Sequence, residues 1–288
     1  MSPRTPPQRR LRRRGRAAEP PAEPMSASAA PTGATSGTAT DTTPPEADDP
    51  APGRLRRFGP VLLLRTAHPR LALATGLALA GGAALSGRTT AEVATVLLTV
   101  LVGQAMLGWA NDLVDRRRDA SNERLDKPIA QGLLDPGDVA FALSVGVLLV
   151  VPLAISHGVW AGLSYLGALV IGLLGNLVLR RGRLSWVTWA ASFALYPAFL
   201  AYGGFSGDGP DSPPEIAITA LAAALGVCVH VLVSLPGLVL DNENGIRHLP
   251  LRIAIRVGAA RVLWGTVAVT ALVLVGLMAT GAQIGLRQ

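Results

Sequence analysis

Three aspartates near the middle of the chain have the spacing of residues that share one face of a helix. Asp112, Asp115 and Asp119 are three and four residues apart, and Asn111 lies four residues before Asp115. All four side chains are therefore expected to point the same way. Like charges at this spacing destabilise a helix, and a divalent cation would remove the repulsion. Oxygen ligands suit Mg²⁺, which proteins usually hold through one or two carboxylates together with substrate phosphates. The pattern predicts a magnesium and phosphate site, with a solvated helix end laced with Arg–Asp pairs as the alternative.

A loop that comes after the aspartates carries the only lysine of the chain. Pro128 and Gly132 interrupt regular structure, so this loop is expected to fold back toward the aspartates. Lys127 would supply a compact positive charge for a phosphate, or it serves membrane topology alone. The arginines between the aspartates, Arg116 to Arg118, are expected on the other faces of the helix.

A second acidic segment lies more than a hundred residues further along. Asp241 and Glu243 precede Gly245 and Arg247. Two acidic sites at one membrane face are best explained by a shared ligand, since two carboxylate-held Mg²⁺ ions could grip a diphosphate from both sides. Arg247 could add a fork-shaped contact to the same phosphates. Asn and Gly in this segment also suit a turn that ends a helix, and the two interpretations are compatible.

Three other residues interrupt the apolar segments. Asn176 is expected to hold helices together or to face a substrate cavity. His230 is expected to be packed and hydrogen-bonded instead of binding a metal. Cys228, the single cysteine, is expected to be a small packing residue. No Gly-rich phosphate loop, nucleophile elbow or zinc-ligand spacing is found.

The composition is that of a membrane protein. Half of the 288 residues are hydrophobic, 16% are charged and the mean hydropathy is +0.40. The net charge of +7 does not indicate nucleic-acid binding, because a soluble basic domain is lacking. We expect an all-α, polytopic membrane bundle of about seven helices, each near the ~20 residues that cross a bilayer. The apolar segments are 69–87, 91–110, 139–156, 159–179, 186–204, 215–236 and 262–284.

Domain organisation and topology can be predicted from composition and charge. Residues 1–53 are rich in Pro, Ala, Thr and Arg and are expected to form a disordered tail, before a transmembrane domain at 54–288. With a cytoplasmic N-terminus, the outer connections carry Arg88 and Arg287 as their only basic residues. This bias predicts an integral protein of the bacterial plasma membrane, with both acidic motifs in the cytoplasm.

The motifs together resemble a known family. Asn111-Asp112-x-x-Asp115-x-x-x-Asp119, with Lys127-Pro128 after it, resembles the first aspartate-rich motif of the UbiA-type intramembrane prenyltransferases. The run 245–250 is similar to the segment directly after that family's second motif, and 175–185 is similar to the end of its fourth helix. The resemblance implies Mg²⁺-dependent transfer of a prenyl group from an isoprenoid diphosphate to a small, aromatic acceptor. It assigns the metal-bridging role to Asp112, Asp115, Asp119 and Asp241, and diphosphate contacts to Asn111 and Lys127.

Two departures from the family pattern leave alternatives open. The first position of the second motif is Gly237, and Glu243 could substitute only if its loop turns inward. The family has nine spans as a rule, so closure with fewer helices, pairing in an oligomer and a truncated product are all compatible with the sequence. An intramembrane terpene cyclase would use the same ionisation without an acceptor. A catalytically impaired member would retain the motifs for lipid or partner binding.

Overall fold

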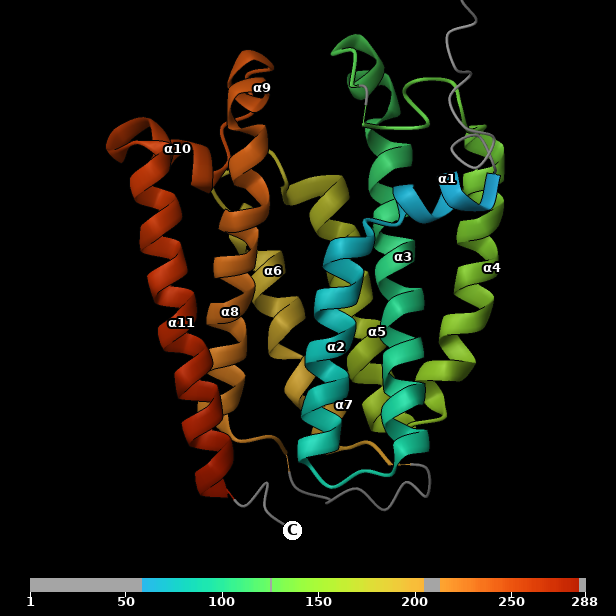
Figure 1. Ribbon diagram of the computed structural model, residues 1–288, viewed down its shortest axis with the longest axis vertical. Coiled ribbons are helices and arrows are strands. Elements are labelled where there is room, and N and C mark those ends of the chain that lie inside the picture. Colours follow the sequence, from blue (N-terminus) through green and yellow to red (C-terminus); the bar gives the residue numbers. More distant parts are fainter. Residues whose placement is uncertain (1–58, 125, 205–212, 285–288) are drawn as a thin grey trace, which may run out of the picture. The chain divides into compact units, whose positions relative to one another are not determined.

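The computed structural model describes residues 59–124, 126–204 and 213–284, and its regular elements there are all helical, as predicted (Figure 1). The predicted tail, residues 1–53, lies outside these ranges, so its disorder and the boundary at residue 54 stay predictions. The helices are α1 (Gly59–Thr66), α2 (Pro69–Leu85), α3 (Thr90–Ser121), α4 (Pro136–Ile155), α5 (Val159–Leu174), α6 (Ser185–Ala194), α7 (Tyr196–Ala201), α8 (Ile216–Ser234), α9 (Leu238–Glu243), α10 (Leu249–Val257) and α11 (Ala259–Ile284). A π-helical turn, η2 (Gly175–Leu179), continues α5, and a 3₁₀ turn, η3 (Leu235–Gly237), joins α8 to α9.

Five helical stretches within the described residues are long and apolar enough to cross a membrane. They are α3, α4, α5 with η2, α8 through α9, and most of α11. All seven predicted apolar segments are helical, but α2 has only 17 residues and the segment 186–204 is divided between α6 and α7. Pro197 explains this division, because proline is accommodated in the first turn of a helix and not in its interior. The chain is an integral membrane protein.

Helix α3 carries the first acidic motif beyond the apolar part of the bundle. A capping box begins the helix: the Thr89 hydroxyl accepts from the Glu92 amide, and the Glu92 carboxylate accepts from the Thr89 amide. The helix has 32 residues, or about 48 Å at 1.5 Å per residue, whereas the hydrocarbon core is about 30 Å thick. Its last turns therefore project out of the apolar layer and hold the aspartates at the boundary.

Close backbone approaches hold the helices together. A Cβ on Gly108 of α3 would lie 2.8 Å from the carbonyl carbon of Ala67, just before α2. A Cβ on Gly226 of α8 would lie 2.4 Å from the carbonyl oxygen of Trp189 in α6. Such contacts matter in a membrane, where apolar side chains gain little by leaving lipid for the protein interior. Many large apolar side chains face outward, as lipid contact requires, among them Phe141, Leu148 and Met278.

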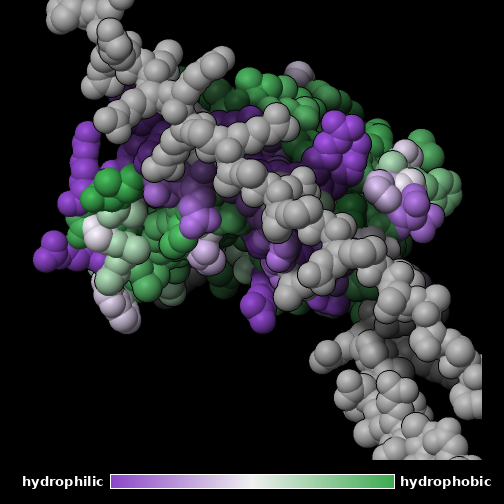
Figure 2. All heavy atoms as spheres, turned by 90° about the horizontal axis from the view of Figure 1, so that it is seen from above, coloured by the Kyte–Doolittle hydropathy of each residue, from purple (hydrophilic) through white to green (hydrophobic). Residues whose placement is uncertain are grey.

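The two acidic motifs lie at the same end of the bundle. The end of α3, the segment that comes after it, and helices α9 and α10 are all at the top of Figure 1. Figure 2 looks onto this end and shows hydrophilic residues gathered between groups of hydrophobic ones. The fold thus places the two acidic motifs at one end of the bundle, as predicted.

Candidate active site

The three aspartates of α3 are buried, as one shared inward face requires. Asp112, Asp115 and Asp119 are 2%, 6% and 2% exposed, respectively. Burying a carboxylate is costly unless it is paired or coordinates a metal. The alternative interpretation, a solvated helix end, is therefore wrong for this face. The Arg–Asp pairs that this alternative also predicted are present.

Asp112 is held by two residues from other segments. Lys127 Nζ donates to Asp112 Oδ1 at 2.5 Å, so the loop after α3 does fold back onto the aspartates. His68 Nε2 lies 3.0 Å from the same oxygen and 3.1 Å from Lys127 Nζ. His68 has φ 52° and ψ 58°, a left-handed conformation that is uncommon outside glycine and often found at functional sites.

Asp115 and Asp119 are held by arginines. Arg180 Nη1, just beyond η2, donates to Asp115 Oδ2, and Arg118 Nη2 donates to the same oxygen at 3.1 Å. Arg118 Nη2 also lies 3.7 Å from Asp119 Oδ1. The expectation that Arg118 occupies another face is wrong, because Arg118 lies three residues after Asp115 and its side chain is a neighbour of the buried carboxylates on the same helix. Arg116 and Arg117 are exposed, as predicted.

A separate ion pair occupies the start of the lysine loop. Arg124 Nε and Nη2 donate to Asp126 Oδ1 and Oδ2 at 2.8 and 2.7 Å. The hydrogen bonds from Arg124 lower the pKa of Asp126 to about 2. Asp126 is therefore an acidic residue near the site, and both of its carboxylate oxygens already accept hydrogen bonds from Arg124.

The second motif lies next to the first. Asn244 Nδ2, at the end of α9, donates to Asn122 Oδ1 at the end of α3, with 3.4 Å between them. The charges of Arg118 and Arg180 act on Asp241 as well as on the first motif. Asp241 is half-buried, and His248 Nε2 lies 3.0 Å from its Oδ2. The structure thus brings Asp241 into the same electrostatic cluster.

Other predicted residues of the second motif point elsewhere. Glu243 is exposed, so it does not turn inward to replace the acidic position occupied by Gly237. Arg247 is also exposed and donates to Asn242 Oδ1 at 2.6 Å. A diphosphate contact from Arg247 stays a prediction, and Arg118 and Arg180 supply the arginine charge that lies against the aspartates.

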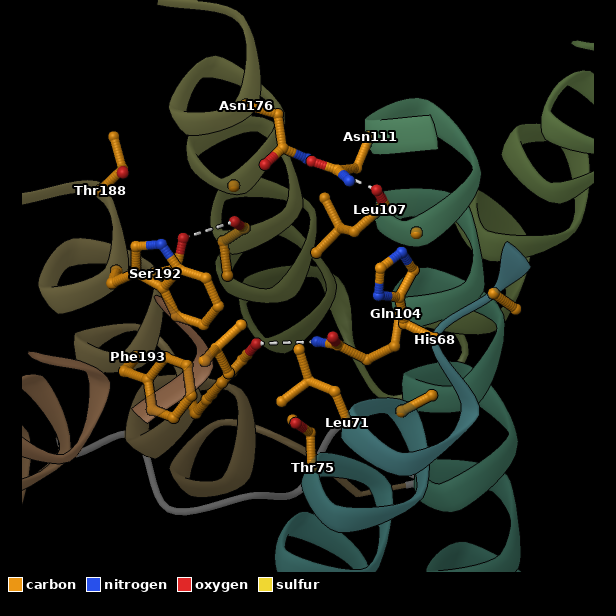
Figure 3. Close-up of a pocket in the computed structure, with 18 residues that line it drawn as sticks. His68, Leu71, Thr75, Gln104, Leu107, Asn111, Asn176, Thr188, Ser192 and Phe193 are labelled. Carbon is orange, nitrogen blue, oxygen red and sulfur yellow. Dashed lines mark hydrogen bonds between the residues drawn. The ribbon is translucent and has the colours of Figure 1, made fainter. Parts of the chain in front are cut away.

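An apolar cavity of about 150 Å³ opens beside His68 and Asn111 (Figure 3). His68 and Asn111 line the cavity and also contact Asp112 Oδ1, at 3.0 and 3.4 Å. Asn176 faces Asn111 across the same end of the cavity and donates to the Leu107 carbonyl at 3.4 Å. Further in, Gln104 Nε2 donates to the Tyr196 hydroxyl at 3.2 Å. Both predicted roles of Asn176, holding helices together and facing a cavity, are consistent with this placement.

The donor set suits a hard cation shared with a ligand. Asp112 Oδ2 and Asp119 Oδ1 are buried oxygens that have no hydrogen-bonding partner in the part of the chain that the structure describes. No group of three or more His, Cys, Asp or Glu side chains within the described residues is close enough to hold a metal by itself. Mg²⁺ is commonly bound through one or two carboxylates plus phosphate oxygens, so these residues fit it when a phosphate completes the coordination.

The other two polar residues in apolar segments are packing residues, as predicted. His230 is buried, and its Nε2 lies 3.0 Å from Ser185 Oγ. Cys228 is buried and free.

Four site residues were not predicted: His68, Arg118, Arg180 and His248. Arg180 had a usable signal, since it lies four residues after Asn176 in the stretch that resembles the family. The π-helical turn between them changes which way the next residues face, and such turns are frequent at functional sites. His68 had a weaker signal, a histidine directly before the proline that opens α2.

Fold and site together define a helical membrane protein whose buried acidic and basic cluster adjoins an apolar cavity. The sequence model of the UbiA prenyltransferase family matches residues 71–286, well over half of the chain. The chain therefore belongs to the UbiA prenyltransferase family, as the motifs predicted.

Solved structures with the same fold come from a UbiA homolog of Archaeoglobus fulgidus. Its structure bound to GPP and Mg²⁺ has a TM-score of 0.58 at 20% identity, over 75% of this chain and 76% of that one. Its structure bound to DMAPP and Mg²⁺ has a TM-score of 0.56 at 19% identity, over 74% and 75%. A search of curated protein sequences gave no match.

Proposed function

We propose that this protein transfers a prenyl group from an isoprenoid diphosphate to a small aromatic acceptor, using Mg²⁺. The observation that carries the proposal is that His68 and Asn111 belong both to the charged cluster and to the wall of the apolar cavity. A ligand with a charged head and an apolar tail suits such a continuous arrangement. The homolog structures bound to GPP or DMAPP with Mg²⁺ support the same ligand class.

Charge balance supports the need for a divalent cation. The cluster holds four carboxylates, Asp112, Asp115, Asp119 and Asp241, against the cations Lys127, Arg118 and Arg180. The excess is negative, so the site by itself repels a diphosphate. Magnesium ions held by these aspartates would reverse the sign and act as a Lewis acid on the departing diphosphate.

The chain's own residues then bind and position the substrate. Lys127, Arg118 and Arg180 are close enough to the aspartates to contact phosphate oxygens as well, and Arg forms bidentate contacts with them. Asn111 and Asn176 supply amide groups at the cavity end. The apolar cavity wall holds the prenyl tail and keeps water from the carbon that becomes positive. Stabilisation of developing charge is usually the largest single contribution to catalysis.

The orientation in the membrane is part of the proposal. The bias of Lys and Arg toward connections at the end with the acidic motifs supports a cytoplasmic location for that end. We further propose the bacterial plasma membrane as the location of the protein. Oligomerisation stays a prediction.

Substitution of Asp115 tests the assignment. Asp115→Ala should lower Mg²⁺-dependent diphosphate release from geranyl diphosphate by about 10²–10³-fold, by analogy with the loss of one oxyanion donor. Asp126→Ala is the matched control, because Asp126 is paired with Arg124 and should be dispensable for release. Unchanged release in Asp115→Ala would refute the assignment.

The products decide between transfer and cyclisation. Trp189, Phe193 and Tyr196 line the cavity, and aromatic faces attract a cation. Such a lining suits either reaction. Mass spectrometry should show a prenylated aromatic acid when an acceptor is supplied. A cyclised hydrocarbon or alcohol formed without acceptor would identify a terpene cyclase instead.

A further inference from the structure

His248 is a buried histidine that joins the start of α10 to the carboxylate of Asp241. It is 4% exposed and precedes the first residue of α10. Its Nδ1 accepts a hydrogen bond from the Leu251 amide at 3.2 Å. Its Nε2 lies 3.0 Å from Asp241 Oδ2. One imidazole ring therefore caps a helix with one nitrogen and contacts an acidic residue with the other.

The helix cap decides which ring nitrogen carries the proton. A backbone N–H can only donate, so Nδ1 must be the unprotonated, accepting nitrogen. In the neutral ring Nε2 then carries the hydrogen and donates it to Asp241 Oδ2. The helix start thus fixes both the ring position and the direction of the bond to Asp241.

Asp241 has fewer hydrogen-bonding partners than Asp112 or Asp115. It lies in the short helix α9, between the 3₁₀ turn η3 and the turn at Gly245, where φ is +70°. Among the described residues, His248 alone forms a hydrogen bond with the Asp241 side chain, whereas Asp115 has two arginines. Gly237 offers no side chain beside it.

We infer that His248 is a positioning residue for Asp241. Its Nε2–H holds Oδ2 and leaves Oδ1 to bind the metal and phosphate assembly, so that one oriented carboxylate serves where the family has an acidic pair. This inference rests on the proposed function of Asp241. Groups that orient a metal-binding side chain commonly change metal affinity by about 10–100-fold when they are removed.

Two substitutions separate the two roles of the ring. In His248→Asn the amide oxygen can replace Nδ1 as the helix cap, but the side chain is too short to reach Asp241. In His248→Gln the amide nitrogen can replace Nε2 as the donor, but the cap is lost. Each purified variant is examined for its thermal unfolding midpoint without metal. The second measurement is the Mg²⁺ concentration that gives half-maximal binding of a non-hydrolysable geranyl diphosphate analogue.

The expected results are opposite for the two variants. His248→Asn should unfold near the wild-type temperature but need about 10–100-fold more Mg²⁺. His248→Gln should unfold at a lower temperature but need Mg²⁺ at close to the wild-type concentration. A wild-type Mg²⁺ requirement in His248→Asn, or an equal loss in both variants, would overturn the inference.

Asp241→Asn distinguishes this inference from the proposed function. Weak analogue binding in Asp241→Asn with wild-type binding in His248→Asn would overturn the positioning role alone. Wild-type binding in Asp241→Asn would overturn the proposed role of Asp241 itself, and the inference with it.

Discussion

Gly237 leaves room for a second carboxylate beside Asp241. A Cβ at this position would lie 3.4 Å from Asp241 Oδ2, an ordinary van der Waals distance. The φ of Gly237 is −94°, so an L-residue is not forced into the left-handed region. An aspartate could therefore replace Gly237 without backbone strain. The second carboxylate is missing because of the residue type at this position and not because of the backbone conformation.

Gly237→Asp should lower the Mg²⁺ concentration needed for binding of the diphosphate analogue. The added carboxylate would sit next to Asp241 and provide further oxygen ligands. Gly237→Asn has nearly the same shape without the charge and serves as control, with an expected Mg²⁺ requirement near that of wild type. A raised requirement in Gly237→Asp would indicate that metal does not bind beside Asp241.

At the scale of individual side chains, the sequence predicts that the three aspartates share one face. It does not predict most of the basic residues that contact them. The three- and four-residue spacing of Asp112, Asp115 and Asp119 survives in any α-helix, so sequence alone places them together. Arg180 and His68 meet these aspartates only because α2 and η2 pack against α3. Arg118 lies three residues after Asp115, a spacing that makes the two side chains neighbours on a helix, so its place beside the acidic face could have been predicted.

At the scale of the helices, the backbone just before α2 packs directly against Gly108 of α3. This close contact is possible only because Gly108 has no side chain. A Cβ there would meet the backbone of Thr66 and Ala67 at 2.8–2.9 Å. These are backbone atoms that cannot rotate away as a side chain can. His68 is the next residue and contacts Asp112, so the helix packing and the site geometry share this contact.

Gly108→Ala should therefore disturb both stability and binding. Overpacking of this kind typically costs about 1–3 kcal/mol, and displacement of His68 should weaken binding of the diphosphate analogue. Thermal unfolding and titration with the analogue measure the two effects. Gly81→Ala in α2 is the control, because no atom of the described residues lies within 4 Å of its added Cβ. Equal behaviour of the two variants would show that this contact does not position His68.

The helices themselves were largely predictable from apolar length. Each predicted segment is helical because long apolar stretches in lipid must satisfy their backbone groups internally. The division of 186–204 had a signal in Pro197, but sequence does not show whether proline kinks a helix or ends it. The π-helical turn after α5 had no signal, since it depends on packing at the end of the helix.

The fold gathers distant segments of the chain into one charged end that adjoins an apolar cavity. A TM-score of 0.58 at 20% identity with the Archaeoglobus fulgidus homolog shows that this fold tolerates replacement of most side chains. Membership of the family was predictable because its first motif is local in sequence. The cavity was not, because its lining comes from helices far apart in the chain.

Under the proposed function, a diphosphate binds next to the buried aspartates only when Mg²⁺ is also bound. Calorimetric titration of the purified protein with the non-hydrolysable geranyl diphosphate analogue, with and without Mg²⁺, tests this dependence. The excess of carboxylates over cations predicts binding with Mg²⁺ and at least about tenfold weaker binding without it, a difference of about 1.4 kcal/mol or more. Equal affinity under the two conditions would contradict the proposal.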